Sequence, residues 1–115
     1  MQVSVKMPIR VAAASSDGKY VNQHFGKADK FLIFDIKDNE EHEFIELRET
    51  APRCGGDPNL KNETIKLISD CDILLVSQIG PGAQKKLLNT GVRPLIMPVF
   101  IEDALEKLYS LLQEG

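Results

Sequence analysis

The chain has no tryptophan, only two cysteines and two histidines in 115 residues, and no apolar run long enough to span a bilayer. So few cysteines fit a reduced, cytoplasmic protein better than a disulfide scaffold. A formal charge of -3 gives no support to non-specific nucleic-acid binding. With 43% hydrophobic residues, this length predicts one domain with a mostly aliphatic core.

The first eight residues differ from the rest of the chain. Residues 1–8 lack the apolar segment of a signal peptide, and Pro8 separates them from the first apolar run. We interpret them as an N-terminal arm that precedes a single domain of residues 9–115.

Three strands are predicted in the first half of the chain. Residues 9–14 are almost continuously apolar, which is typical of a central strand. Residues 31–36 are rich in aromatic and β-branched side chains. Residues 42–49 mix apolar and charged side chains, which indicates an exposed face or an edge. Together they predict an antiparallel meander.

The second half alternates helices and strands. Helical spacing predicts helices over residues 59–69 and 101–112, and a third helix that begins at Gly80-Pro81-Gly82 and ends near residue 89. Short apolar runs predict strands over residues 72–77 and 93–98. The order βββαβαβα predicts a single-domain α/β fold with a mixed sheet and helices on its faces.

Three chemically dense loops follow strands that are expected to point the same way. In a meander the first and third strands are parallel, and the fourth strand joins them if it lies parallel to the first. Their carboxyl ends carry His24, Cys54 and Gly80, and ligands of open α/β sheets bind outside such ends. We therefore expect these loops to share one edge, with Cys71 at the opposite edge.

His24 and Cys54 are the candidate metal ligands. His24 lies in a loop that is longer than a plain strand connection needs, although it also fits an ordinary surface histidine. Cys54 is followed by two glycines, and Arg53 would lower the pKa of its thiol, although an ordinary loop cysteine is equally compatible. One histidine and one cysteine are too few for a closed zinc site. They suit a cluster that brings its own structure, since imidazole and thiolate both bind iron.

The remaining residues of the long loop have structural interpretations as well. Phe25 is expected to anchor the loop to the core, and Gly26 to supply a positive φ. Asp17 falls in a turn, where its carboxylate is expected to cap backbone amides.

Three positions outside that loop, at Cys71, His42 and Gly80, have structural interpretations too. Cys71 is interpreted as a small buried hydrophobic residue, and His42 is given only a structural role. The turn at Gly80 is either an anion seat at a helix N-terminus or merely a tight connection, and the second interpretation is favoured.

Several segments resemble one known family. Residues 11–18 and 21–28, with the run Val21-Asn22-Gln23-His24-Phe25-Gly26, are similar to the opening signature of the dinitrogenase iron–molybdenum cofactor biosynthesis family. Residues 71–80 and 87–92 resemble its second half. This family includes small nitrogenase-cofactor carriers and the carboxy-terminal domain of the cofactor-assembly radical enzyme. The resemblance covers residues 9 to about 108.

The resemblance implies a ribonuclease-H-like three-layer fold without nuclease activity. It also implies transient binding of an iron–sulfur or iron–molybdenum cluster, or of a precursor, by a carrier that is not an enzyme. Its partners would be proteins that donate and accept the metallocluster. The family's motif histidine corresponds to His24, its cysteine after the third strand to Cys54, and its later cysteine to Cys71.

The leading hypothesis is therefore a metallocluster carrier with His24 and Cys54 as metal ligands. Other residues expected to contact the cluster lie in the same three loops: Asp17, Asn22, Gln23, Phe25, Gly26, Gly55 and Gly80. The alternative is a small-molecule or nucleotide-binding regulatory module that uses the turn from Gly80 to Gly82. A metal-dependent nuclease is disfavoured because no carboxylate set stands out.

Overall fold

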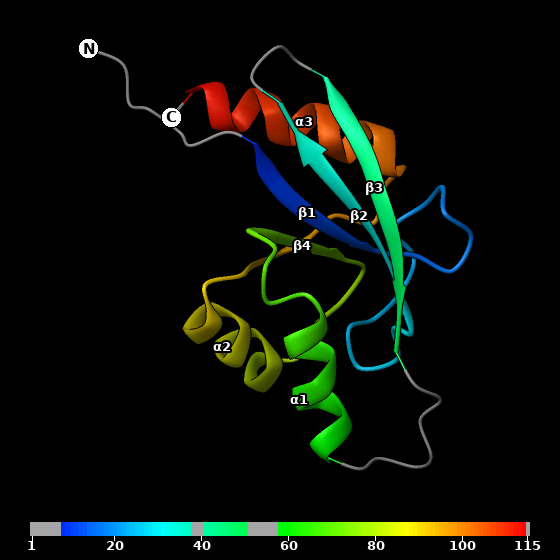
Figure 1. Ribbon diagram of the computed structural model, residues 1–115, viewed down its shortest axis with the longest axis vertical. Coiled ribbons are helices and arrows are strands. Elements are labelled where there is room, and N and C mark those ends of the chain that lie inside the picture. The colour runs from blue at the N-terminus through cyan, green and yellow to red at the C-terminus, as the bar shows by residue number, and fades with distance from the viewer. Residues whose placement is uncertain (1–7, 38–40, 51–57, 115) are drawn as a thin grey trace.

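A computed structural model describes residues 8–37, 41–50 and 58–114 (Figure 1). The elements follow one another in the predicted order: β1 (Ile9–Ala14), β2 (Lys30–Ile36), β3 (His42–Glu49), α1 (Pro58–Leu67), β4 (Ile73–Val76), α2 (Pro81–Thr90), β5 (Arg93–Ile96) and α3 (Ile101–Glu114). Within the described ranges, no helix has both the length and the apolar character needed to cross a membrane.

The strands form one five-stranded mixed sheet in the order β3-β2-β1-β4-β5. β1 pairs antiparallel with β2 and parallel with β4, and β5 continues the parallel half. The prediction that the apolar first strand is central is therefore confirmed, as is the antiparallel meander of the first three strands. β3 and β5 are the edges of this sheet.

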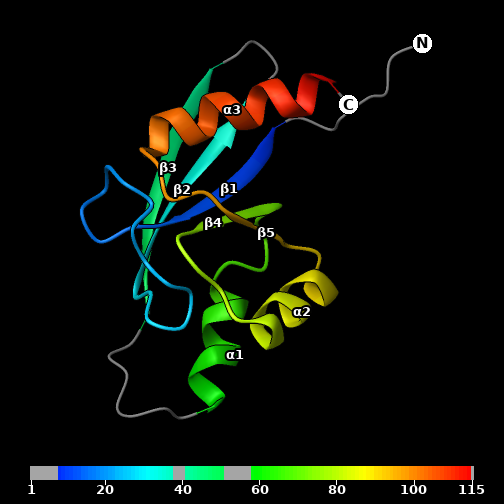
Figure 2. The same ribbon diagram turned by 180° about the vertical axis from the view of Figure 1, so that it is seen from behind.

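Helices cover both faces of the sheet, as Figures 1 and 2 show from opposite sides. α3 lies on one face, called here the α3 face, and α1 and α2 lie on the other, called the α1–α2 face. Ala12, Ala13 and Ala14 of β1 are fully buried between these layers. Their small side chains let helices approach the middle of the sheet from both sides.

The apolar spacing of α3 and the end residues of α2 follow local chemistry. α3 buries Ile101, Ala104, Leu105 and Leu108, whose spacing places them on one side of the helix. α2 has a proline at its first position and ends at Gly91, whose φ of 96° is the left-handed C-cap conformation.

A group of ion pairs ties three strands to the turn after α1. The Arg10 guanidinium donates to both carboxylate oxygens of Asp35, at 2.9 and 3.2 Å, and to Asp70 at 3.2 Å. Arg48 of β3 donates to both oxygens of Asp70 and to the carbonyl oxygen of Leu67. The hydrogen bonds from Arg48 and then Arg10 hold the pKa of Asp70 well below its ordinary value.

Candidate functional site

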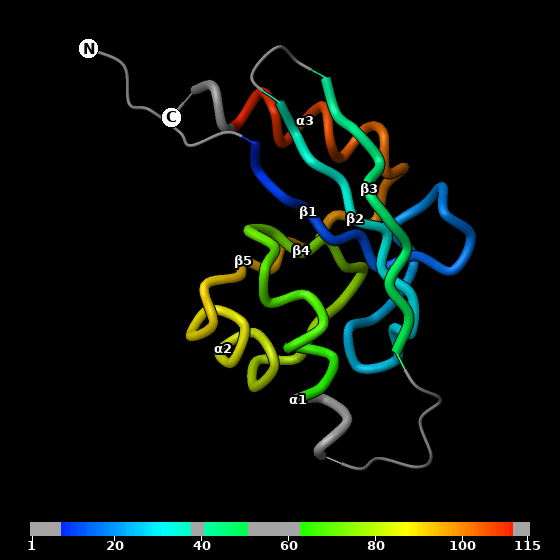
Figure 3. Tube along the Cα trace, in the orientation of Figure 1, coloured from blue at the N-terminus to red at the C-terminus, as the bar shows by residue number. Residues whose placement is uncertain are grey.

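The loop Ser15–Asp29 is fastened to the connection between β4 and α2 by its main chain. Figure 3 shows this loop as the blue segment that projects from the end of β1. The Ser77 amide donates to the Gln23 carbonyl oxygen at 3.0 Å, and the Phe25 amide donates to the Gln78 carbonyl oxygen at 2.9 Å. His24 therefore forms a parallel bridge with Gln78, two residues beyond the carboxyl end of β4.

The same loop is also fastened to the connection between β5 and α3. The Val21 amide donates to the Val99 carbonyl oxygen at 2.9 Å, and the Ile101 amide donates to the Lys19 carbonyl oxygen at 2.8 Å. The Tyr20 hydroxyl donates to the Pro98 carbonyl oxygen at 2.6 Å. Residues 15–29, 77–80 and 97–100 thus form one continuous surface, which we call the carboxyl rim.

Asp17 closes the first turn of the loop. Its Oδ1 accepts hydrogen bonds from the amides of Lys19 and Tyr20, at 2.9 and 3.0 Å, and from the Ser15 hydroxyl. These amide hydrogen bonds, with that of Lys19 first, lower the pKa of Asp17. The prediction that this carboxylate caps a turn is confirmed.

Asn22 closes the loop on itself. Its Oδ1 accepts from the Ser16 amide and its Nδ2 donates to the Ser16 hydroxyl, both at 3.0 Å. The side chains of Asp17 and Asn22 are therefore committed to the shape of the loop. Any contact that they make with a ligand stays a prediction.

The positive φ in this loop belongs to Gly18, at 75°, and the prediction of a positive φ at Gly26 is wrong. The Ser15 hydroxyl and the Asp17 carboxylate build a turn whose geometry requires a left-handed residue at position 18.

We expect Gly18→Ala to lower the free energy of unfolding by about 1 kcal/mol, because an L side chain is strained in the left-handed region. Gly26→Ala is the matched control and should change it by less than about 0.5 kcal/mol, because a Cβ there meets nothing within 4 Å. Urea unfolding followed by circular dichroism measures both. Equal losses in the two variants would contradict this assignment.

Neighbouring residues His24 and Phe25 point in opposite directions. The Phe25 ring is buried in the core on the α1–α2 face, with its centroid 6.4 Å from that of Phe31, so its predicted role as an anchor is confirmed. His24 is exposed at the rim. Beside it, Gln23 Oε1 is buried and has no hydrogen-bond partner among the described residues.

Open space adjoins the glycines on both sides of the rim. A Cβ added at Gly26 or at Gly80 would meet nothing within 4 Å. Gly80 is the N-cap of α2, and no side chain caps that helix terminus. No three His, Cys, Asp or Glu side chains gather to hold a metal ion among the residues described. Among the described residues of the rim, His24 supplies an imidazole, and the Gln23 amide and main-chain groups lie beside it.

Cys54 and Gly55 lie outside the described residues, so their predicted place beside His24 stays a prediction. The end of β3 is informative, because the Thr50 amide donates to the Asp29 carbonyl oxygen at 2.9 Å. Thr50, which precedes the segment that contains Cys54, therefore lies beside Asp29, the last residue of the His24 loop.

Cys71 lies at the amino end of β4, at the edge opposite the rim, as predicted. It is buried in the core on the α1–α2 face, and this burial, with the Asp70 carboxylate next to it, raises the pKa of its thiol to about 12. It is therefore protonated near neutral pH, and the prediction of a small buried residue is confirmed.

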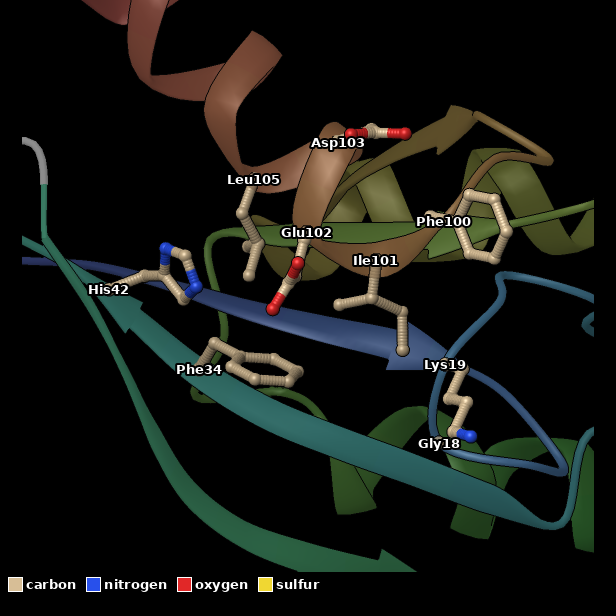
Figure 4. Close-up of a pocket in the computed structure, with 9 residues that line it drawn as sticks. All are labelled: Gly18, Lys19, Phe34, His42, Phe100, Ile101, Glu102, Asp103 and Leu105. Carbon is tan, nitrogen blue, oxygen red and sulfur yellow. The ribbon is translucent and has the colours of Figure 1, made fainter.

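The sequence did not reveal a hollow of about 470 Å³ beneath the first turn of α3 (Figure 4). Its lining includes Phe34, His42 and Phe100, which come from three separate segments. His42, for which only a structural role is predicted, is exposed on β3. Its ring packs edge-on against that of Phe34, with 6.3 Å between the ring centroids.

Comparison with known proteins gives consistent matches. Residues 7–111 match the model of a family described as dinitrogenase iron-molybdenum cofactor. Over 87 residues the chain is 33% identical to Protein NifY of Azotobacter vinelandii, which covers 76% of this chain. Over 114 residues it is 30% identical to Protein NifX of that organism, which covers 93% of this chain and 69% of NifX. The crystal structure of PH0822 shares the fold, with a TM-score of 0.65 at 22% identity over 89% of this chain and 90% of that one.

The chain spans only part of some of these relatives. It covers 35% of NifY, and 24% of an FeMo cofactor biosynthesis protein NifB from Chlorobaculum tepidum, to which it is 30% identical over 101 residues, 87% of this chain. The family match itself extends over nearly the whole sequence. The chain therefore belongs to the dinitrogenase iron–molybdenum cofactor family.

Proposed function

We propose that this chain binds and carries an iron–sulfur or iron–molybdenum cluster, or a precursor of the cofactor, without catalysing a reaction on it. The observation that supports this most is the exposed His24, held by paired main chain at an open rim. The description of the matched family and the name of the FeMo cofactor biosynthesis protein NifB point to the same cargo.

The chemistry of the rim suits a bulky anionic guest. A neutral imidazole nitrogen is a good ligand for iron, so His24 would bind a metal atom of the cargo directly. The N-terminus of α2 at Gly80 carries no side-chain cap, and its dipole favours negative charge nearby. The open space at Gly26 and Gly80 would admit a guest larger than a single ion.

The other candidate residues take supporting roles in this proposal. Cys54 would supply a thiolate ligand to the cluster, and Gly55, which lacks a side chain, would let the main chain come close to it. Both residues belong to the segment that follows Thr50, whose amide is bonded to Asp29. Gln23 would offer its amide, and Asp17 and Asn22 would keep the loop in shape. Few protein ligands suit a carrier, because the cargo has to leave again.

The resemblance to the family extends this proposal to partners and setting. The carrier would receive its cluster from one protein of cofactor biosynthesis and deliver it to another in the cytoplasm. The three-layer sheet would then be a ribonuclease-H-like scaffold used for binding rather than for cleavage.

Isolated iron–molybdenum cofactor, added anaerobically, tests the proposal. We expect the wild-type chain to co-migrate with the cofactor in gel filtration and to change its visible absorbance. His24→Ala should weaken binding at least about tenfold, as expected for loss of a metal ligand, and His24→Ala with Cys54→Ala should abolish it. His42→Ala is the matched control and should bind normally. Unchanged binding by the double variant would refute the assigned site.

The uncapped N-terminus of α2 supports a second candidate function, the binding of a small anion. A regulatory module that binds a nucleotide or another small anion would use the amides after Gly80. Inorganic phosphate or ATP would then raise the melting temperature of the metal-free chain. Thermal stabilisation by these anions, together with no binding of the cofactor, would favour this function over the carrier.

A further inference from the structure

β3 is an edge strand that leaves apolar side chains uncovered. Phe44 is 51% exposed and Leu47 is 46% exposed. They lie opposite Phe34 and Leu32 of β2, which belong to the core beneath α3, so both point to the α3 face. Exposed apolar side chains along an edge strand mark a place where another strand can pair.

A bulge gives β3 an unusual distribution of side chains between the two faces. The register with β2 shifts between Ile33 and Phe34, so that Ile45 is the extra residue and turns to the α1–α2 face. As a result, the even and odd positions exchange faces halfway along the strand. The α3 face receives His42, Phe44, Leu47 and Glu49, and the other face receives Glu43, Ile45, Glu46 and Arg48.

We propose that two copies of this chain associate by pairing β3 antiparallel with β3 over its whole length. A two-fold axis between Ile45 and Glu46 would then join the two five-stranded sheets into one. Phe44 would lie opposite Leu47 of the second copy, and this contact would occur twice. The proposal does not depend on the cargo of the carboxyl rim.

The side chains of β3 are complementary to themselves in this register. His42 faces Glu49 of the second copy and Glu43 faces Arg48, while the two Phe44–Leu47 contacts make one apolar cluster in the middle. Within one copy, Glu43 already pairs with Lys37 at 2.7 Å, and Arg48 pairs with Glu46 and Asp70. The Glu43–Arg48 contact between the copies would therefore extend existing ion pairs.

The bulge is what makes this pairing consistent. Opposed residues in an antiparallel pair must point to the same face. The pairs His42–Glu49, Glu43–Arg48 and Phe44–Leu47 do so only because the faces exchange at Ile45. A shift of one residue would place Phe44 opposite Glu46, which points to the other face. Full overlap is therefore the register in which Phe44 meets Leu47, and Glu43 meets Arg48, on matching faces.

The expected dimer is weak and leaves both cargo sites free. One strand pair buries less surface than a standard interface, so we expect a Kd on the order of 10 μM. Because the two copies of β3 run in opposite directions, the carboxyl rims would lie at opposite ends of the joined sheet.

Sedimentation equilibrium over a range of concentrations around this Kd tests the proposal. We expect the wild-type chain to dimerise, and Phe44→Lys and Leu47→Glu to be monomeric when each is alone. An equimolar mixture of these two variants should dimerise again, because the mixed pair has one Lys–Glu contact and one original Phe–Leu contact. Leu88→Lys, at a residue of α2 that is 53% exposed, is the matched control and should dimerise like the wild type.

A measurement on the wild-type chain alone guards against variants that fail to fold. Amide hydrogen exchange along β3 should slow as the protein concentration rises, whereas exchange along β5, the opposite edge, should not. A wild type that stays monomeric throughout, a mixture that stays monomeric, or β3 exchange that ignores concentration would each overturn the proposal.

Discussion

Replacing Phe25 by alanine is expected to lower the free energy of unfolding by about 3–5 kcal/mol. The ring is 1% exposed and packs with Phe31 in the core between the sheet and the helices α1 and α2. Its loss removes apolar contacts and leaves a cavity beneath the loop that presents His24. Because a domain of this size is stable by only about 5–15 kcal/mol, the loss is a large share of the total. Urea unfolding followed by circular dichroism measures it.

Phe25→Leu provides the control for this experiment. Leucine keeps most of the apolar contact and leaves the main-chain hydrogen bond to Gln78 in place, so we expect a loss of about 1–2 kcal/mol. If Phe25→Ala cost no more than Phe25→Leu, the phenylalanine would not be the anchor of the loop.

Acid should weaken the fold through Asp70. Its pKa is lowered from 3.8 by hydrogen bonds from Arg48 and Arg10, so its carboxylate stabilises the folded state at pH values above 3.8. This contribution is lost as the pH falls through 3.8 toward the lower folded-state pKa. Asp70 is 48% exposed, so solvent screening reduces the effect to about 1–2 kcal/mol.

Asp70→Asn separates this contribution from other acid effects. We expect the variant to be less stable than the wild type by about 1–2 kcal/mol near neutral pH, and the difference to shrink progressively as the pH falls below 3.8. Urea unfolding across this pH range measures both curves. Glu106→Gln, at an exposed position of α3, is the matched control and should follow the wild-type curve. A constant difference between wild type and Asp70→Asn at all pH values would contradict the titration.

Most of the fold followed from apolar periodicity and from turn residues. The predicted bounds of β1 and β3 are those observed, because breakers and polar residues flank both runs. The strand predicted over residues 72–77 is observed as the shorter Ile73–Val76, and the Asp72 carboxylate just before it accepts from the Arg10 amide at 2.9 Å. The bulge at Ile45 left no signal, because a mixed apolar and charged strand does not reveal where its faces exchange.

The candidate site was predicted less completely than the fold. The sequence located the loop, the outward His24 and the inward Phe25, because their residue types have opposite preferences for water. It did not reveal that the loop is fastened by Gln78 and Val99, since main-chain hydrogen bonds do not depend on residue type. The left-handed position was assigned to Gly26 instead of Gly18, because both glycines lie in polar turns.

That fastening has a consequence for how such proteins diversify. The hydrogen bonds that join the loop to Ser77, Gln78 and Val99 use peptide groups, which any non-proline residue supplies. Mutation can therefore change the outward side chains, and with them the choice of guest, while the path of the chain is inherited intact. Related proteins can therefore differ in the side chains that bind a ligand while they keep the same backbone path.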